Sequence, residues 1–546
     1  MRSSAQRTAE TTAPAARGAY RGESRRALAP LPPRWRVPLL ATALSLPLYA
    51  LWAAFLATGG GDLAAQVSWT DFVARHPGAP YNLSWYGGIH VGNYSVLAPQ
   101  LMALLGVRTV TVLSGAAASW LAAALFVRSG TDRPLWPALL ATLTLWCNVA
   151  SGRSTFALGV ALALGACLVL TGTSRRPVLA GVLGALASMA SPVAGLFLLV
   201  AGAGWLLDRD WRKAAVLCVP PAAVVGATTL VFPFGGEMPM SPGDIWKPVL
   251  FGVLLLALAP REWRALRHGA WVYAAGVVLT FLVPSPVGSN VVRLAELFAA
   301  PVLLAAILAH GVRIWRRVAL AAALALSLQW VTEHAVHVLR MSTPVPVWAA
   351  EAHGVVAALD RLGADRTRVE AVPAVDHRET TVLGPHVDLA RGWNRQIDVE
   401  RGALFYDGTF SAETYRSWLD HWAVGYVVLP DGTPDWAAEE EAALVRDRPD
   451  WLRLVWRDAH WRVYRVEDAT PLVSGAGASV VGRDGAELVV RVRERGSVTV
   501  RVAYSPWLRP DAGCLERAGR WTRLRVPAAG EYRIGSSYAP PRRGAC

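Results

Sequence analysis

The densest group of polar side chains follows the first long apolar stretch of the chain, which ends at Thr58. The segment GGGDLAAQVSWTDFVARHPGAPYNLSWYGGIHVGNYS contains the acids Asp62 and Asp71 together with His76, Asn82, Tyr86, His90, Asn93 and Tyr94. Asp62 comes four residues after Thr58, at the level of a lipid interface. A carboxylate in this position can act as a general base toward an acceptor hydroxyl. An interfacial helix N-cap or a solvated loop acid is the alternative.

A second polar group lies far along the chain, in ARGWNRQIDVERGALFYDG. It contains Arg391, Trp393, Asn394, Arg395, Asp398, Phe405, Tyr406 and Asp407. Aromatic rings beside planar hydrogen-bonding groups suit stacking on sugar rings and binding of sugar hydroxyls. The same residues could equally pack this segment against the first polar segment, so both interpretations stay open.

Several classes of chemistry have no local signature in the sequence. The motifs GxxxxGK(S/T), GxGxxG, HExxH, paired CxxC and Gly-x-Ser-x-Gly are all missing, which argues against standard ATP hydrolysis, dinucleotide, zinc and serine-hydrolase sites. His334 and His337, beside Glu333, have the spacing of a metal pair, but an interfacial helix face explains them better.

The elements that position these residues are long apolar runs between Pro38 and Thr332. Runs such as PLLATALSLPLYALWAAFLAT reach the roughly 20 apolar residues that cross a bilayer. The 546 residues are 53% hydrophobic and only 17% charged, with a mean hydropathy of +0.32. The net charge of +14 does not indicate nucleic acid, because the basic residues cluster at the ends of the runs. These clusters are Arg128/Arg133, Arg175/Arg176, Arg209/Arg212/Lys213, Arg261/Arg264/Arg267 and Arg313/Arg316/Arg317.

The positive-inside rule places these clusters in the cytoplasm and allows the spans to be counted. The runs are Pro38 to Thr58, Thr109 to Val127, Pro134 to Ala150, Thr155 to Thr171, Pro177 to Leu207, Ala214 to Phe232, Pro248 to Pro260, Ala270 to Pro284, Leu294 to Val312 and Val318 to Thr332. The fifth is basic on both sides, so it must cross twice, with a break at Ser191-Pro192. Eleven passes result, with the N-terminus cytoplasmic and the C-terminal part extracytoplasmic.

The chain therefore divides into four predicted parts. Residues 1–36 form a disordered basic cytoplasmic tail, and 37–343 a mainly α polytopic domain with a long first outer loop over 59–107. Residues 344–468 mix helices and strands in an extracytoplasmic α/β domain, and 469–546 form a small β-sandwich. Cys514 and Cys546 are the only cysteines of the outer part, so a disulfide between them is one of two open outcomes.

Together these features resemble the GT-C superfamily of polyprenyl-phosphate-sugar-dependent glycosyltransferases. The segments DLAAQ, YNLSWYGGIH, LASMASPVAGLFL, SNVVRLAELFAAPVLLA and ARGWNRQIDVERGALFYDG are similar to those of a group of actinobacterial integral membrane proteins. One departure concerns the first loop, where many superfamily members have two adjacent acids. Here Asp62 stands between Gly61 and Leu63, and the next acid is Asp71.

The resemblance implies a donor sugar on a long isoprenoid phosphate, whose phosphate needs a cation near the outer interface. Arg293 lies at that depth, and an intramembrane pair with Glu296 is the alternative role. Arg108, Arg153, Lys247 and His90 are weaker candidates for the same contact. A divalent cation is the one cofactor that this interpretation allows, and no protein metal site is expected.

The sequence thus predicts a membrane glycosyltransferase of the plasma membrane that acts on a cell-envelope acceptor at the outer face. Asp62 is the expected base, and the expected substrate-binding residues are Arg293, His90, Asp71, Tyr86, Arg108, Trp393 and Arg395. The expected partners are the bilayer, the polyprenyl-phosphate-linked sugar and an envelope glycan, without nucleic acid. A transporter or flippase of lipid-linked material and a non-catalytic envelope scaffold are the alternatives.

Overall fold

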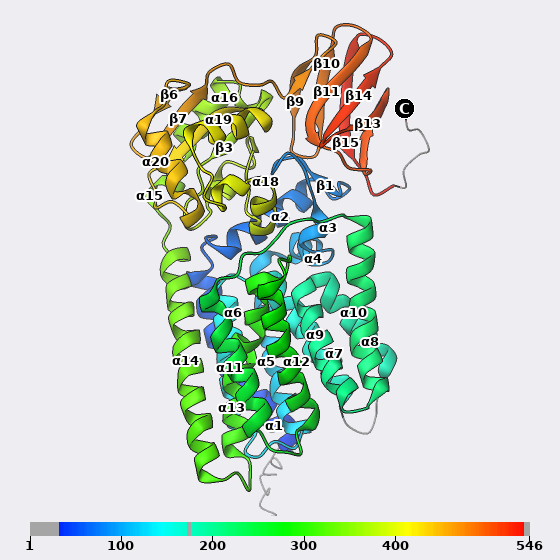
Figure 1. The fold of residues 1–546 in the computed structure, drawn as a ribbon, viewed down its shortest axis with the longest axis vertical. Helices are drawn as coiled ribbons and strands as arrows, with labels where there is room; N and C mark the ends of the chain where they lie inside the picture. The colour runs from blue at the N-terminus through cyan, green and yellow to red at the C-terminus, as the bar shows by residue number, and fades with distance from the viewer. Residues whose placement is uncertain (1–31, 172–175, 540–545) are drawn as a thin grey trace, which may run out of the picture.

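Three layers follow one another along the long axis of the molecule (Figure 1): a helical bundle, a middle layer from residues 59–107, and two strand-containing domains side by side. The computed structural model describes residues 32–171, 176–539 and 546. Most of the tail predicted over 1–36 therefore lies outside the described residues. We call the end of the bundle that meets the middle layer its upper end, and the opposite end its lower end.

Eleven helices form the bundle in the described part of the chain, one at each place where a pass is predicted. They are α1 (Pro33–Leu51), α5 (Val107–Arg128), α6 (Leu135–Ala150), α7 (Ser154–Val169), α8 (Pro177–Ala190), α9 (Pro192–Leu207), α10 (Trp211–Val231), α11 (Pro242–Leu258), α12 (Arg264–Leu282), α13 (Arg293–Leu308) and α14 (Ile314–Ser342). The predicted break is present, since α8 ends at Ala190 and α9 begins at Pro192.

Six of these helices are long and apolar enough to cross a membrane: α1 with the π-helical turn Trp52–Leu56, α5, α10, α12, α13 with the turn before it, and α14. The other five have 14 to 17 residues, so the count of eleven passes stays a prediction. In the most apolar 18-residue stretch of α10, and likewise of α12, only 17% of the residues are buried inside the protein, whereas 56% are buried in the corresponding stretch of α13. Apolar side chains that face outward in this way suit contact with lipid.

The predicted basic clusters lie on one side of the bundle. The connections α5–α6, α9–α10, α11–α12 and α13–α14 all lie at the lower end, away from the strand-containing domains (Figure 1). Asp132 and His310 join two of these connections through an ion pair of 2.6 Å. This one-sided distribution is the pattern that the positive-inside rule describes.

The middle layer is folded and docks on both domains above it. It contains α2 (Asp62–Arg75), β1 (Tyr81–Asn82), β2 (Ile89–His90), α3 (Val91–Tyr94) and α4 (Ala98–Leu105). Trp69 and Phe72 of α2 share one apolar core with Val369 and Val428 of the domain that follows. The backbone N–H of Leu83 donates to the carbonyl of Gly485 in the sandwich, over 2.7 Å.

A mixed five-stranded sheet organises the α/β domain. Its order is β4 (Asp388–Leu389), β3 (Arg368–Ala371), β5 (Val424–Pro430), β7 (Trp461–Val466) and β6 (Leu452–Arg457), with β3 parallel to β4 and β5 and the other pairs antiparallel. All seven residues of the central strand β5 are buried, as its apolar sequence VGYVVLP requires. The principal helices are α16 (His353–Arg361), α18 (Arg395–Arg401), α19 (Ala412–His421) and α20 (Glu439–Asp447), with the short α15 (Val347–Ala350) and α17 (Glu379–Val382).

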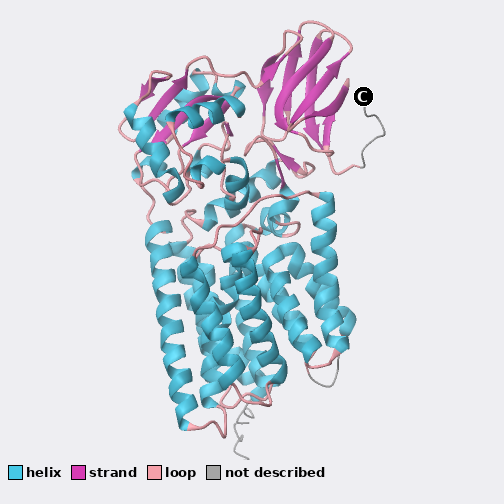
Figure 2. Ribbon diagram, viewed as in Figure 1, coloured by secondary structure: helices cyan, strands magenta, loops and turns pink. Residues whose placement is uncertain are grey.

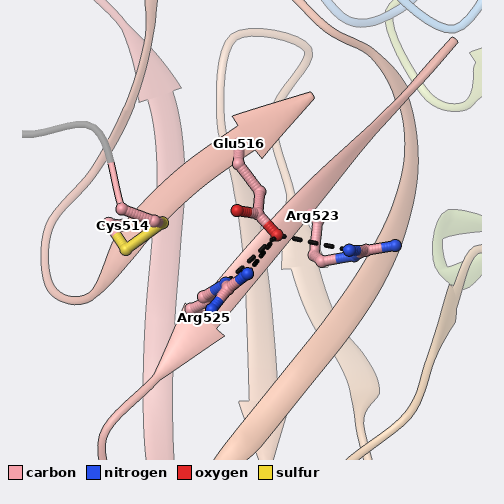
Figure 3. Close-up of a disulfide and its surroundings, with 5 residues drawn as sticks. Cys514, Glu516, Arg523 and Arg525 are labelled. Atoms are coloured by element: carbon pink, nitrogen blue, oxygen red, sulfur yellow. Dashed lines mark hydrogen bonds and ion pairs between the residues drawn. A yellow bond between two sulfur atoms is a disulfide. The ribbon is translucent and has the colours of Figure 1, made fainter. Parts of the chain in front are cut away.

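Two four-stranded antiparallel sheets form the sandwich, which Figure 2 shows as the all-strand unit of the molecule. One has the order β12 (Leu508–Pro510), β15 (Gly530–Ser536), β10 (Leu488–Val492), β9 (Ser479–Arg483), and the other β13 (Cys514–Ala518), β14 (Trp521–Val526), β11 (Gly496–Ala503), β8 (Val473–Ser474). Alternate residues such as Val490, Val498 and Leu524 fill the core between them. Cys514 forms a disulfide with Cys546 beside the surface cluster of Glu516 with Arg523 and Arg525 (Figure 3).

Candidate active site

Asp62 lies at the junction of the bundle, the middle layer and the α/β domain. It is the first residue of α2, and Gly61 before it is the N-cap, so Asp62 is not the capping residue of this helix. Its carboxylate Oδ2 is 3.5 Å from the Arg153 Nε and 3.9 Å from a terminal nitrogen of Arg293. The side chain stays 35% exposed, so a substrate can reach a carboxylate that two guanidinium groups hold in place.

Arg153 contacts the acids Asp62 and Glu296 and also His334. It precedes α7 and is held by Glu296 at 2.7 Å and by the His334 Nε2 at 2.8 Å. The alternative that the sequence left open, a pair of Arg293 with Glu296, is not found, because the close partner of Glu296 is Arg153. Gly152 makes the approach possible: its φ is +76°, and a Cβ there would lie 2.8 Å from the Leu63 backbone nitrogen.

Arg293 is less engaged than Arg153. Within 4 Å and among the described residues, its only carboxylate contact is Asp62, and its guanidinium lies 5.5 Å from the centre of the Phe156 ring. Three helices begin beside it, α2 at Asp62, α7 at Ser154 and α13 at Arg293 itself. Helix N-termini carry a partial positive charge. The site is therefore suited to accept an anion at Arg293.

Gln66 connects the helices that supply these residues. Its Oε1 accepts hydrogen bonds from the backbone N–H of Thr155, at 3.2 Å, and from the hydroxyl of Thr155. Its amide nitrogen bonds the Tyr94 hydroxyl, and the Tyr94 ring stacks on Trp69 of α2 at 5.7 Å. Burial raises the pKa of Tyr94, so this phenol stays protonated and serves as structure.

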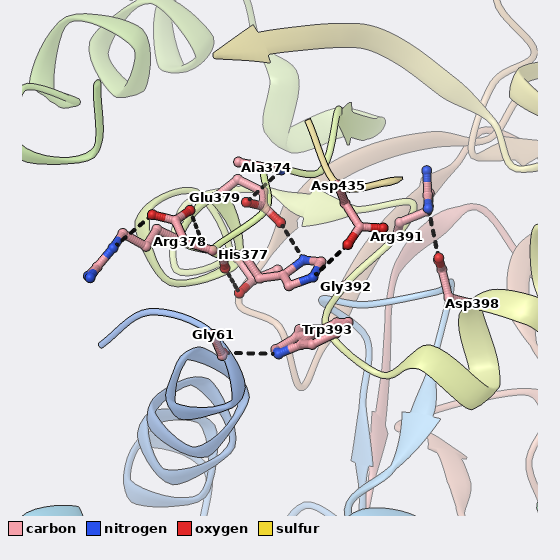
Figure 4. A network of polar contacts seen from close by, with 12 residues as sticks. Gly61, Ala374, His377, Arg378, Glu379, Arg391, Gly392, Trp393, Asp398 and Asp435 are labelled. Carbon is pink, nitrogen blue, oxygen red and sulfur yellow. Dashed lines mark hydrogen bonds and ion pairs between the residues drawn. The ribbon is translucent and has the colours of Figure 1, made fainter. Parts of the chain in front are cut away.

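The α/β domain makes two hydrogen bonds to Gly61, the residue before Asp62, one at its N–H and one at its carbonyl (Figure 4). The Gly61 N–H donates to the Asp376 carbonyl at 2.7 Å, and the Trp393 Nε1 donates to the Gly61 carbonyl at 3.1 Å. Gly61 has a φ of +63°, which favours glycine here. The position of Asp62 is thus set by a domain more than three hundred residues away in sequence.

His377 packs against one face of the Trp393 indole (Figure 4). The two rings stack with centres 3.5 Å apart, and the imidazole lies between Glu379 and Asp435, each at 3.4 Å. Arg395 adds a bidentate pair to Asp435 with two contacts of 2.8 Å. Burial lowers the pKa of His377, but the hydrogen bonds to Asp435 and Glu379 outweigh it, so the net pKa is raised above its ordinary value.

Arg378, the residue after His377, connects the α/β domain to the membrane helices by hydrogen bonds. Its guanidinium donates to the Thr58 carbonyl at 2.6 Å and to the Ser342 carbonyl at 2.8 Å, so it joins the end of the first span to the end of α14. Gly60 passes between them, and a Cβ there would lie 2.6 Å from the Ser342 carbonyl oxygen. This explains why glycines precede Asp62.

An apolar cavity of about 660 Å³ lies in the bundle below the site. It follows α13 from Leu294, the residue after Arg293, through Phe298 to Ala305, and reaches Lys213 and Arg264 at the lower end. Phe197 also lines it and packs edge-on against Phe156, the ring beneath Arg293. The cavity thus runs along the membrane depth, and its lining includes Leu294, the neighbour of Arg293 in the chain.

The structure brings together only part of the predicted site. His90 is buried, bonds the Ser505 hydroxyl at 2.9 Å and fixes the middle layer to the sandwich; burial and then Arg401 lower its pKa to about 4. The buried Tyr86 donates to the Gly392 carbonyl at 2.8 Å. Asp71 is an exposed residue near the other end of α2. None of the three contacts Asp62 in the described structure.

The other predicted residues also have structural partners. Arg108 donates to the Ala57 carbonyl at 2.8 Å, and Lys247 lies 5.7 Å from the centre of the Trp330 ring. Arg395 is held by Asp435, and Trp393 reaches the site through Gly61. The docking interpretation of this segment is therefore the one that the contacts support. Sequence reasoning missed Gln66 and undervalued Arg153 and His334, because their partners come from distant helices.

A divalent cation does not fit this group of residues. The described chain contains no cluster of three or more His, Cys, Asp or Glu side chains arranged for a metal. Asp62 and Glu296 are the two acids of the site, and Arg153 lies between them with a contact to each. A guanidinium in that place already supplies the positive charge that a metal would bring.

Comparison with known proteins gives limited matches. Residues 475–546, most of the sandwich, match a family described as a domain of unknown function (DUF8823). No curated protein matches the sequence. Among solved structures, arabinofuranosyltransferase AftD from Mycobacteria is similar over 85% of this chain, with 17% identity and a TM-score of 0.44. A mutant form of the same protein is also similar over 85% of this chain, with 16% identity and a TM-score of 0.46. The chain spans 42% and 43% of those two chains.

Proposed function

We propose that this protein is a membrane glycosyltransferase that moves a sugar from a polyprenyl-phosphate donor to a cell-envelope acceptor at the outer face of the plasma membrane. One observation carries the proposal. The Asp62 carboxylate, still accessible, lies 3.9 Å from the Arg293 guanidinium where an apolar cavity of the bundle ends. A base, a cation and room for a lipid chain therefore occur together.

In the proposed reaction the acceptor hydroxyl attacks the anomeric carbon of the donor sugar. A bond forms between the acceptor oxygen and that carbon, and the bond from the carbon to the phosphate oxygen breaks. Asp62 accepts the hydroxyl proton. The leaving polyprenyl phosphate keeps the electron pair, and Arg293 stabilises its charge by charge-assisted hydrogen bonds. Attack opposite to the leaving group inverts the anomeric centre.

The two arginines have different tasks in this scheme. Arg153 is already bound to Glu296 and His334, so it keeps Asp62 in place. Arg293 has Asp62 as its only carboxylate contact among the described residues, at the long distance of 3.9 Å. A donor phosphate that binds Arg293 would replace this contact and leave the carboxylate free to accept a proton. Donor binding would thereby prepare the base.

The cavity supports a lipid-linked donor over a soluble one. Its lining is largely apolar from Leu294 down to Ala305, so it suits a hydrocarbon chain whose phosphate remains beside Arg293. By the positive-inside rule, the basic lower end favours an orientation with the N-terminus in the cytoplasm and the two strand-containing domains outside. The acceptor would then approach from the side of the α/β domain.

A deletion strain compared with its parent tests this function. A transferase predicts that one glycosidic linkage is missing from the envelope and that the donor lipid accumulates on the outer side of the membrane. A flippase predicts that the lipid accumulates on the inner side, and a scaffold predicts unchanged lipid-linked sugars. Loss of the linkage that wild type restores and Asp62→Asn does not would support transfer, whereas equal restoration by both would contradict it.

A further inference from the structure

A second cavity, of about 590 Å³, lies between the α/β domain and the sandwich. One wall comes from the ends of the α/β strands at Thr367, Tyr426 and Arg465, and the other from β9 of the sandwich at Ser479 to Val481. The linker that closes it crosses between the two domains on the side away from the bundle (Figure 1). This cavity is separate from the Asp62 site.

The cavity has one sign of charge. Arg366, Arg465 and Arg491 line it, and no aspartate or glutamate of the described residues does. Arg491 is paired with Glu531 at 2.6 Å. Arg366 and Arg465 have no carboxylate within 4 Å among the described residues. A cleft lined by a single sign of charge concentrates ligands of the opposite sign.

Neutral groups in the cavity can bind hydroxyls. The side chains of Thr470 and Ser479 line it and have no hydrogen-bond partner among the described residues. Strand β9 is the last strand of its sheet, so one of its edges has no strand partner. Tyr426 contributes a ring whose hydroxyl is 3.4 Å from the Arg465 guanidinium. Two guanidinium groups that have no carboxylate partner in the described part of the chain, two hydroxyls and a strand edge therefore line the same space.

We infer that this cavity between the domains binds an anionic saccharide, a segment that carries carboxylate or phosphate groups. The guanidinium groups bind the anionic groups, and the hydroxyls and the strand edge bind the sugar. A cavity of 590 Å³ exceeds the needs of a single ion and suits several sugar units. The inference rests on the proposed function in one respect, since such a saccharide would be part of the envelope acceptor held above the reaction centre.

Binding is measured by calorimetry on the full chain in detergent, so it does not depend on catalysis. The probes are trigalacturonic acid, which carries carboxylates, maltotriose phosphate, which carries a phosphate, and maltotriose as the neutral control. We expect at least one anionic probe to bind and maltotriose to show no heat. The probe that binds identifies the anionic group.

Three variants locate the binding. The double variant Arg366→Ala/Arg465→Ala should lower the affinity for the anionic probe by about tenfold or more, because charge-assisted hydrogen bonds are lost. Thr470→Trp keeps the charge and fills the cavity, so it should weaken binding to a similar degree. Arg457→Ala with Arg517→Ala removes the same charge from exposed sites outside the cavity and should leave the affinity within about twofold of wild type.

Binding that survives Thr470→Trp, or that falls as much in the Arg457/Arg517 control, would show a diffuse basic surface and no site. Equal affinity for maltotriose, or no heat with either anionic probe, would also exclude the site. Thermal unfolding of each variant checks that it is folded. Transfer that depends on Asp62 can persist in each of these cases, so failure here is distinct from failure of the proposed function.

Discussion

The indole N–H of Trp393 donates a hydrogen bond of 3.1 Å to the carbonyl of Gly61, the residue that precedes the proposed base Asp62. Trp393 belongs to the α/β domain, whereas Gly61 follows the first membrane helix. On its other side Gly61 donates to the Asp376 carbonyl at 2.7 Å. The α/β domain thus fixes the backbone from which the Asp62 side chain extends, which gives this domain a direct role at the membrane site.

Replacing Trp393 with Phe keeps an aromatic ring on His377 and removes the single hydrogen bond to Gly61. We expect the free energy of unfolding to fall by only about 1 kcal/mol, with turnover reduced by about tenfold because Asp62 is held less precisely. The KM for the donor should change little, since Arg293 is untouched. Steady-state kinetics with thermal unfolding measures all three.

Trp436→Phe is the matched control for this variant. Trp436 lies near the same Arg395 guanidinium as Trp393, with ring centres 5.3 Å and 4.9 Å from it. It is 60% exposed and donates no indole hydrogen bond in the described structure. Its replacement should leave turnover close to wild type. Equal losses in the two variants would show that the effect of Trp393 is a general one on the domain and not positioning of Asp62.

Arg293 and Arg153 should respond differently to truncation. Arg293→Ala should raise the donor KM most, because this guanidinium is the one available to phosphate. Arg153→Ala should instead destabilise the fold by about 3–5 kcal/mol, because it leaves Glu296 buried without its partner. Replacing Arg153 and Glu296 together by Met should recover much of that stability without restoring turnover. Unchanged donor KM in Arg293→Ala would remove its phosphate role.

The elements of this structure were largely predictable, and the site only in part. Apolar length located the membrane helices, and Asp62 and Arg293 stood out because each is a charge at the end of an apolar run. Their separation of 3.9 Å could not be predicted, since it depends on how α2 and α13 pack. The short strands β8, β12 and β13 could not be predicted one by one, because two to five residues show too little alternation.

Partner assignments were the part that sequence could not supply. Glu296 lies one turn from Arg293 on the same helix, which suggested a local pair, yet Arg153 from α7 takes that place at 2.7 Å. His90 and Tyr86 looked available for substrate because polar aromatics in a loop usually face solvent. Both are buried, because the loop forms a layer between the bundle and the domains.

His377 should make stability depend on pH with a defined sign. Its pKa is raised in the folded state, so its contribution is complete below the unfolded value of about 6.5 and is lost as the pH rises through the folded value. The charged groups that face it are Glu379, Asp435 and, through Asp435, Arg395. Hydrogen bonds from His377 and Arg395 outweigh burial and keep the pKa of Asp435 well below its ordinary value.

His377→Asn tests this sign, because asparagine tolerates the φ of +53° found here. The difference in Tm between wild type and variant should be largest near pH 6 and should shrink toward about pH 9. A gap for His377→Asn that widens as the pH rises would contradict the assigned sign.

The orientation in the membrane can be measured directly. A reporter fused after Arg317 should score as cytoplasmic and one after Thr343 as extracytoplasmic, because the basic connections gather at the lower end of the bundle. The disulfide between Cys514 and Cys546 fits an oxidising compartment for the sandwich. A cytoplasmic signal after Thr343 would place Asp62 on the wrong side for the proposed reaction.

The turnover of Asp62→Asn in reconstituted membranes is the most direct test of the account. This change keeps the size of the side chain but removes the basic oxygen, so turnover should fall by roughly 100-fold or more. The protein should remain folded, and donor binding should remain measurable. Asp71→Asn, on the same helix and away from both arginines, should retain near wild-type turnover. Wild-type turnover by Asp62→Asn at matched expression would contradict the role of Asp62 as the catalytic base.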